Sequence, residues 1–164
     1  MRLWPKMIIA NINQEVSLAQ LIAIIEQALT QPQTQLQQNI SSEILNATYQ
    51  QAVDAYQQLQ LSPALTAFTY LVMYQPCERK YLIGLASTLH ALEQYQYALV
   101  FYGYASLLDA RDAGVTFRIA QCYLAIEQTS EAIDALQTSI EQSFIAPVQP
   151  DIRRLAQALL DEIL

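Results

Sequence analysis

The residues of this chain that could perform catalysis or bind a metal are few and far apart. His90 is the only histidine, and Cys77 and Cys122 are too distant in sequence for a CxxC or other metal-ligand spacing. No combination of nucleophile, base and orienting group can be assembled from the motifs present. The three glycines are dispersed, so they form no phosphate-binding loop. The sequence therefore predicts a protein that is not an enzyme and that has neither a metal site nor a cofactor.

The residues whose type and spacing do suggest binding are aromatic. Tyr49, Val53 and Tyr56 are separated by four and then three positions, so they share one face of a helix. Tyrosine offers a large apolar area with few rotatable bonds, which suits the anchoring of an extended peptide. The alternative is that both tyrosines are ordinary core residues, because apolar residues at helical spacing usually face the core.

Composition and charge exclude several classes of protein. With 164 residues, of which 53% are hydrophobic and 14% charged, the chain lacks the composition of a disordered protein. Its net charge of −7, and the absence of Lys and Arg between Lys6 and Arg79, disfavour nucleic acid and anionic membranes as partners. No apolar run approaches the roughly 18 residues of a membrane span. We expect a soluble protein of a reducing compartment.

The chain is predicted to be all-α, since clean period-2 alternation and hairpin turns are missing. A first helix is expected over residues 13–30, followed by a glutamine-rich linker that contains Pro32. We therefore assign residues 1–40 to an N-terminal helical extension and linker, and residues 41–164 to one repeat domain.

An internal repeat with a period of 34 residues organises the rest of the chain. Shifting the sequence by this period aligns small residues with one another, namely Ala64, Ala98 and Ala132. Four positions later it aligns large residues, namely Phe68, Tyr102 and Leu136. Such a pattern is typical of antiparallel helix pairs that stack on one another, with small residues where helices cross closely.

Helix boundaries follow from the repeat. We expect an N-cap and first helical residue at Ser62-Pro63, second helices over 94–109 and 130–142, and a last helix over 151–164 with Pro150 at its first position. The last helix is expected to cap the open end of the stack with four apolar residues, Ile152, Leu155, Leu159 and Ile163.

The second repeat carries the motif Leu85-Ala86-x-x-Leu89, followed by Tyr95-x-x-Ala98-x-x-x-Tyr102-x-x-Ala105, and resembles a tetratricopeptide repeat. Three such repeats cover residues 45–146. Together with Tyr81-Leu82-Ile83-Gly84 and Tyr102-Gly103-Tyr104-Ala105, these motifs are similar to the class II chaperones of bacterial type III secretion systems. The resemblance implies a short right-handed superhelix of three repeats with an N-terminal helix and a C-terminal capping helix.

The resemblance also implies a function. Chaperones of this family hold hydrophobic translocator proteins in the bacterial cytoplasm before export, and some also bind a transcriptional activator. The chain is thus expected to bind a translocator and keep it soluble and secretion-competent. The alternative is a tetratricopeptide scaffold or regulatory module that joins soluble proteins, for example a coactivator of a transcriptional regulator.

The resemblance places the cargo in a concave groove lined by the first helix of each pair, where Tyr49 and Tyr56 match the groove tyrosines of the family. The predicted groove residues are Asn46, Tyr49, Val53, Tyr56, Lys80, Ile83, Ser87, His90, Phe117, Gln121 and Leu124.

The N-terminal helix raises the question of self-association. Its apolar stripe consists of Leu18, Leu21, Ile22, Ile25 and Leu29. Members of the family often self-associate through this region, which implies a homodimer with the stripe at its interface. The alternative is that the stripe folds back on the first repeat of the same chain.

Overall fold

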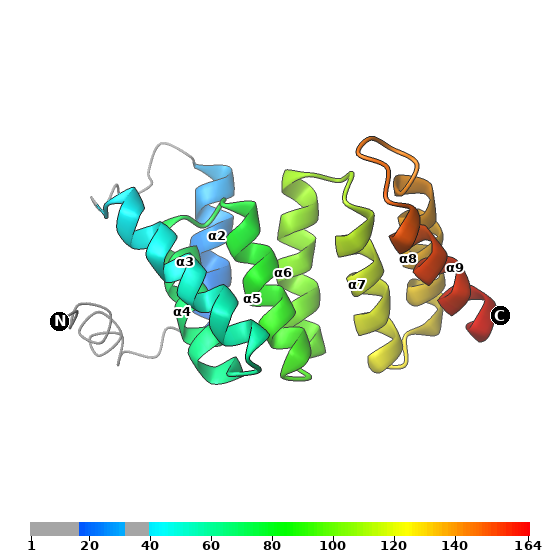
Figure 1. Ribbon diagram of the computed structural model, residues 1–164, viewed down its shortest axis with the longest axis horizontal. Coiled ribbons are helices and arrows are strands. Elements are labelled where there is room, and N and C mark those ends of the chain that lie inside the picture. The colour runs from blue at the N-terminus through cyan, green and yellow to red at the C-terminus, as the bar shows by residue number, and fades with distance from the viewer. Residues whose placement is uncertain (1–16, 32–39) are drawn as a thin grey trace. The chain divides into compact units, whose positions relative to one another are not determined.

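The computed structural model describes residues 17–31 and 40–164, and within these ranges it contains eight helices and no strand (Figure 1). The all-α prediction is confirmed. The helices are α2 (Leu18–Thr30), α3 (Ser42–Gln57), α4 (Leu61–Tyr74), α5 (Arg79–Ala91), α6 (Tyr95–Leu108), α7 (Ala113–Ala125), α8 (Thr129–Gln142) and α9 (Pro150–Ile163).

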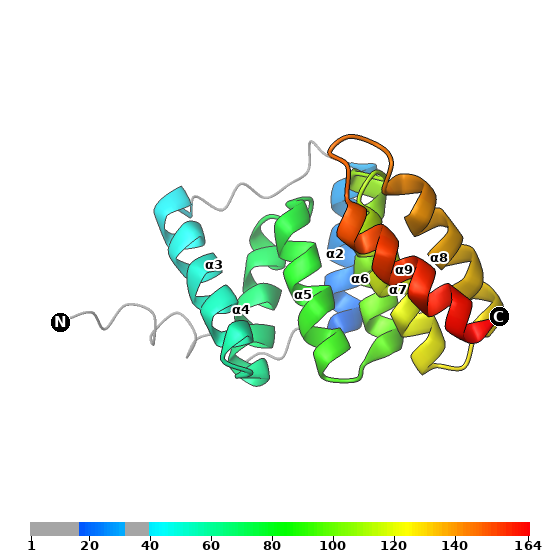
Figure 2. The ribbon, with the colours of Figure 1, turned by 45° about the vertical axis from the view of Figure 1, so that its right-hand side comes forward.

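The chain divides into two compact units, residues 1–88 and 89–164, and the division falls inside α5. The first unit holds α2, α3, α4 and most of α5, and the second holds the end of α5 and α6 to α9. Within the second unit α7 packs on both α6 and α8, and α9 lies against α8 and α7 (Figure 2). The predicted division at residue 40 and the handedness of the superhelix stay predictions.

The 34-residue repeat appears in the structure as a turn that occurs three times. Helices α4, α6 and α8 begin at residues 61, 95 and 129, and each follows a residue in the left-handed region, namely Leu59 (φ 58°), Glu93 (φ 60°) and Glu127 (φ 62°). In the first turn the N–H of Gln60 donates to the Ala55 carbonyl at 2.8 Å, and the N–H of Leu59 donates to the Tyr56 carbonyl at 3.0 Å. These two bonds form a Schellman motif, which ends one helix and directs the chain into the next.

The prediction of an N-cap at Ser62 is wrong. The N-cap of α4 is Gln60 and the helix begins at Leu61, so Ser62 and Pro63 occupy its second and third positions. Because the Schellman turn redirects the chain at Leu59, the helix starts two residues earlier than expected. Pro63 is tolerated there, since the first four N–H groups of a helix have no partner within it.

Helix α2 begins after Ser17, which forms a capping box. The Ser17 hydroxyl accepts from the Gln20 N–H at 3.2 Å, and the Ser17 N–H donates to the Gln20 side chain at 2.9 Å. The end of the helix at Thr30 agrees with the prediction. Residues 13–16 of the expected helix, and residues 32–38 of the expected linker, lie outside the described ranges.

Helix α2 packs against α4 within the first unit, and this contact answers part of the question about the N-terminal stripe. Leu21 and Ile25 are completely buried in the single chain, whereas Leu18, Ile22 and Leu29 are half-buried. The structure thus contains the intramolecular packing that was the alternative to dimerisation, and Leu21 and Ile25 are not available to a partner in this conformation.

The capping helix α9 has Pro150 at its first position, as predicted. Its buried residues are Ala156 and Leu160, which share a core cluster with Ala120 and Leu136. Of the four predicted sealing residues, Leu159 and Ile163 pack against this cluster and Ile152 is half-buried. Leu155 is 49% exposed, so its assignment to the seal is wrong. The buried side of α9 instead contains Ala156, whose small side chain lets the helix pack closely on its neighbours.

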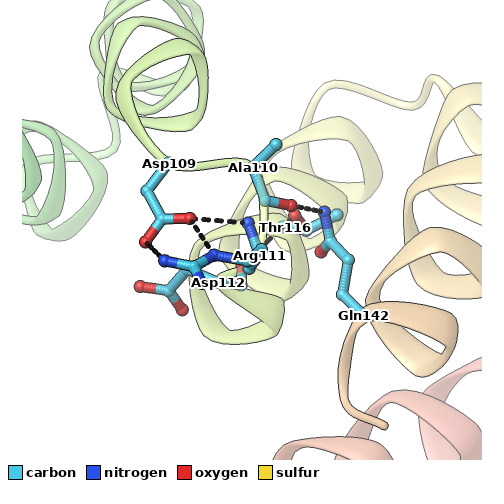
Figure 3. A network of polar contacts seen from close by, with 6 residues as sticks. All are labelled: Asp109, Ala110, Arg111, Asp112, Thr116 and Gln142. Atoms are coloured by element: carbon cyan, nitrogen blue, oxygen red, sulfur yellow. Dashed lines mark hydrogen bonds and ion pairs between the residues drawn. The ribbon is translucent and has the colours of Figure 1, made fainter. Parts of the chain in front are cut away.

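A polar network fixes the turn between α6 and α7 (Figure 3). The Asp109 carboxylate accepts from the Arg111 backbone N–H and from Arg111 Nε, each at 3.0 Å. Gln142 at the end of α8 donates its Nε2 hydrogen to the Ala110 carbonyl at 2.6 Å, and Asp112 is the N-cap of α7. The network ties the start of α7, which carries predicted groove residues, to the end of α8.

Candidate peptide-binding surface

In the first unit the predicted groove residue Tyr49 lies among other aromatic side chains. Its ring is edge-on to Phe68 of α4, with centroids 6.2 Å apart, and it lies 5.6 Å from the ring of Tyr81 on α5. Tyr49 is half-buried, whereas Phe68 and Tyr81 are both 2% exposed. Part of the Tyr49 ring therefore belongs to the core of the unit and part of it faces solvent.

Lys80 adds a positive charge to this aromatic surface. Its Nζ lies 5.0 Å from the centroid of the Tyr49 ring and 5.3 Å from that of Tyr81, which is the range of cation–π interactions. The Lys80 side chain is exposed, so its ammonium group can still donate hydrogen bonds to a ligand. The site combines apolar tyrosine area with one donor of positive charge.

Gly84 permits the aromatic side chains to pack in this way. A Cβ atom at position 84 would overlap the ring of Phe68, so only glycine leaves room for that ring beside α5. Glycine costs about 1 kcal/mol relative to alanine within a helix, and the close approach of Phe68 accounts for its presence here.

The other predicted residues of the first unit differ in exposure. Asn46 is exposed, Val53, Tyr56 and Ile83 are half-buried, and Ser87 is buried. Tyr56 lies on the same helix as Tyr49 and, like Tyr49, is partly exposed. Ser87 is too enclosed to offer much surface to a peptide.

In the second unit His90 lies in a cluster with two tyrosines and a cysteine. Its Nδ1 is 3.5 Å from Cys122 Sγ, and its ring is edge-on to Tyr95 and Tyr102 at centroid distances of 5.6 and 6.3 Å. Burial, and to a lesser degree the charge of Arg118, lower the pKa of His90 below its usual 6.5. His90 is therefore neutral at pH 7 and offers a weakly polar surface.

Cys122 is a packing residue of α7. Its side chain is completely buried, and burial raises the pKa of its thiol to about 12, although the charge of Arg118 acts in the opposite direction. A thiol that stays protonated at neutral pH is a poor nucleophile.

The remaining predicted residues of the second unit lie on α7. Phe117 packs against the core cluster of that unit and is half-buried, so it too combines packing with partial exposure. Gln121 and Leu124 are half-buried. The sequence analysis did not include Phe68 and Tyr81 in the site, although their rings pack against Tyr49. Tyr81 could have been included, because it follows the predicted groove residue Lys80 directly and belongs to the motif that carried the resemblance.

Two further properties concern only the described parts of the chain. Among residues 17–31 and 40–164, no three His, Cys, Asp or Glu side chains are grouped so that they could hold a metal ion. No helix in the same ranges is both long and apolar enough to span a bilayer.

Several curated proteins are similar in sequence to this chain. The low calcium response locus protein H of Yersinia pseudotuberculosis is 27% identical over 117 residues, which cover 71% of this chain and 68% of the relative. The chaperone protein SicA of Salmonella dublin is 29% identical over 93 residues, which cover 57% of this chain and 56% of the relative. The chain thus spans between about half and two thirds of the length of these relatives. No family model matches the chain.

Several solved structures resemble this one. A chain of the CopN-Scc3 complex has 30% sequence identity and a TM-score of 0.63, with 76% of this chain and 69% of that chain covered. The Yersinia enterocolitica type III secretion chaperone SycD, solved with a peptide of the translocator YopD, has 25% identity and a TM-score of 0.71, with 76% of this chain and 95% of that chain covered.

Proposed function

Because this chain belongs to the translocator chaperones of type III secretion systems, we propose that it binds a hydrophobic translocator protein and keeps it soluble and secretion-competent in the bacterial cytoplasm. In this role the chain acts by binding and carries out no catalysis. The proposal extends to this chain what the solved SycD complex contains, namely a peptide of a translocator.

The observation that carries the proposal is the partly exposed surface formed by Tyr49 and Lys80, against which the buried ring of Tyr81 packs. An extended peptide directs successive side chains to opposite faces and leaves its backbone carbonyls free to accept hydrogen bonds. The exposed part of Tyr49 offers an apolar contact to such side chains, and Lys80 Nζ offers a donor to a carbonyl or carboxylate. We infer that this surface anchors one end of the bound segment, with Tyr56 and Val53 further along α3.

The surface suits a chaperone because it is held in place before cargo arrives. Phe68 and Tyr81 support the Tyr49 ring from two directions, so little side-chain freedom is lost on binding. In the second unit, we propose that the half-buried residues His90, Phe117, Gln121 and Leu124 also contact the translocator.

The test is co-expression of the chain with the translocator of its own secretion system. The variant Lys80→Glu changes an exposed side chain, so the helical signal in circular dichroism should remain while the soluble translocator falls at least tenfold. The matched control is Arg154→Glu on α9, which makes the same change of charge at a side chain that is 78% exposed and should leave the soluble translocator unchanged.

Tyr49→Ala should also weaken binding, but it removes a ring that packs on Phe68 and Tyr81. Its melting temperature must therefore be measured beside its binding. A translocator that remains soluble with both Lys80→Glu and a folded Tyr49→Ala would contradict the proposed site. A translocator that is insoluble even with the wild-type chain would contradict the chaperone function and favour the scaffold alternative.

A further inference from the structure

The loop that joins α8 to α9 exposes five consecutive apolar residues. Residues 144–148, which we call the apolar loop, have the sequence Phe-Ile-Ala-Pro-Val, and all five are exposed. Phe144 is 62% exposed, Val148 58% and Ile145 46%. Among residues 17–31 and 40–164, no other five consecutive residues are all apolar and all exposed. Exposed apolar residues usually occur singly, so a continuous run of them indicates a binding surface.

Hydrogen bonds hold the apolar loop in place, and the loop extends beyond the end of α8 (Figure 1). The N–H of Gln149 donates to the Ser143 carbonyl at 2.9 Å, which closes the base of the loop. The Ser143 hydroxyl donates to the Ile140 carbonyl at 2.6 Å, and the N–H of Ile145 donates to the Gln142 carbonyl at 2.9 Å. A loop that is fixed in this way loses little conformational freedom when it binds a partner.

The same connection is shorter and more polar in the other repeats. The turns from α4 to α5 and from α6 to α7 each take four residues, 75–78 and 109–112, whereas the connection from α8 to α9 takes seven, 143–149. Three of the four residues in the second turn are charged, namely Asp109, Arg111 and Asp112. Four mostly polar residues thus suffice to join one repeat to the next helix, and the fold does not require the apolar loop.

One positive charge lies against the apolar loop. The Cζ atom of Arg153 lies 4.1 Å from the centroid of the Phe144 ring. The N–H groups of a guanidinium lie in its plane, so a stacked arginine can still donate to a carboxylate. Within the described parts of the chain Arg153 has no carboxylate partner, whereas its neighbour Arg154 pairs with Asp151 at 3.0 Å. The loop therefore combines apolar area with an unpaired cation.

We propose that the apolar loop and Arg153 bind an apolar segment of the translocator that carries an acidic residue at its edge. This segment is distinct from the extended peptide at Tyr49 and Lys80, and the inference rests on the proposed function. A translocator that is insoluble alone exposes more apolar surface than one extended peptide contains, so its chaperone must cover further apolar area. Phe144, Ile145 and Val148 supply such area, and a carboxylate would pair with the Arg153 guanidinium.

Charge argues against two other occupants. An anionic membrane would be repelled by the net charge of −7. A second copy of the chain that paired loop to loop would bring two Arg153 side chains together. A single carboxylate beside apolar residues meets neither penalty.

The first test uses the two neighbouring arginines in co-expression with the translocator of the same secretion system. Arg153→Glu should lower the soluble translocator about threefold, because it places a second negative charge opposite the acidic residue of the segment. The matched control is Arg154→Glu, which makes the same change one residue away at a side chain that already has a partner within the chain, and it should leave the soluble translocator unchanged. Circular dichroism should show the same helical signal for both variants.

The second test removes apolar area from the loop. Phe144→Ser combined with Val148→Ser should also lower the soluble translocator about threefold, since less apolar surface of the cargo is then covered. The matched control is Leu59→Ser combined with Leu164→Ser, which removes two leucines that are 79% and 81% exposed outside the loop. This control should keep the translocator as soluble as the wild type does.

Photocrosslinking identifies what the loop contacts. With Ile145→benzoylphenylalanine in the co-expressed complex, ultraviolet light should join the chain to the translocator. Mass spectrometry should place the adduct in a different translocator segment from the one joined by Tyr56→benzoylphenylalanine on α3. An adduct only with a second copy of the chain would overturn the inference. So would flotation of the free chain with phosphatidylglycerol vesicles that the double serine variant of the loop abolishes.

The outcomes separate this inference from the proposed function. If the wild type keeps the translocator soluble and both Arg153→Glu and the double serine variant of the loop do so equally well, the inference fails while the chaperone function stands. If the wild type itself leaves the translocator insoluble, both fail.

Discussion

Gly84 and Gly103 each lie well inside a helix, whereas Gly114 lies in the first turn of one, and the surroundings of the first two differ. Gly84 of α5 faces the ring of Phe68, which occupies the space where a Cβ would stand, whereas Gly103 of α6 faces open space. Both glycines lower helix propensity by about 1 kcal/mol relative to alanine. Only at Gly84 does the fold of the chain itself explain that loss.

Packing within the chain therefore explains the glycine at position 84 but not the glycine at position 103. Phe68 is 2% exposed and lies against Tyr49, so the glycine at position 84 is part of the support for the proposed peptide-binding surface. At position 103 a Cβ would meet no other atom within 4 Å, so packing within the chain does not require glycine there.

Gly84→Ala should have the largest effect. The new methyl group would overlap the buried Phe68 ring, so the free energy of unfolding should fall by about 3 kcal/mol, the upper range for overpacking a core. Urea denaturation followed by circular dichroism measures this change. The displaced ring should also disturb Tyr49 and weaken translocator binding.

A second substitution shows whether the cause is the ring. Phe68→Leu alone should destabilise the chain by leaving a cavity, but combined with Gly84→Ala it should cost less than the sum of the two changes. Additive losses would mean that the Cβ at position 84 and the ring do not compete for space, and the contrast with Gly103 would then lose its physical basis.

Gly103→Ala should have the opposite sign. In dilute solution the free energy of unfolding should rise by about 1 kcal/mol, because alanine gains helix propensity and its methyl group meets no other atom. A destabilised monomer would show that position 103 is constrained within the chain.

Much of this contrast could be predicted from the sequence. The missing strand signals indicated the all-α fold, and a glycine within a helix of the second repeat, as at position 84, is typical of a close approach by a neighbouring group. The sequence could not identify Phe68 as the approaching group, because a contact between two helices depends on how their faces meet. The groove residues on α3 and α5 were chosen from a resemblance, and the structure adds their supporting rings.

Helix boundaries were predicted less well, and the repeated turn shows why. Leu59, Glu93 and Glu127 adopt the backbone conformation that glycine favours, without being glycine. Ser62-Pro63 fitted the usual pattern for a helix start, so the boundary was placed too late. A residue other than glycine in the left-handed region cannot be recognised from its type alone. Only the 34-residue spacing of the three positions could have indicated a shared turn.

Leu59→Gly tests the same comparison from the other direction and should have the smallest effect. Leu59 is 79% exposed and has φ 58°, so glycine would relieve backbone strain without removing buried apolar area. The greater freedom of glycine in the unfolded chain offsets part of this gain, which leaves a net stabilisation of about 0.5 kcal/mol. Urea denaturation of Leu59→Gly beside Glu93→Gly and Glu127→Gly measures it, since the three turns share one geometry. If all three variants lose stability, the left-handed conformation costs these residues little, and the free energy of each turn is dominated by the Schellman hydrogen bonds.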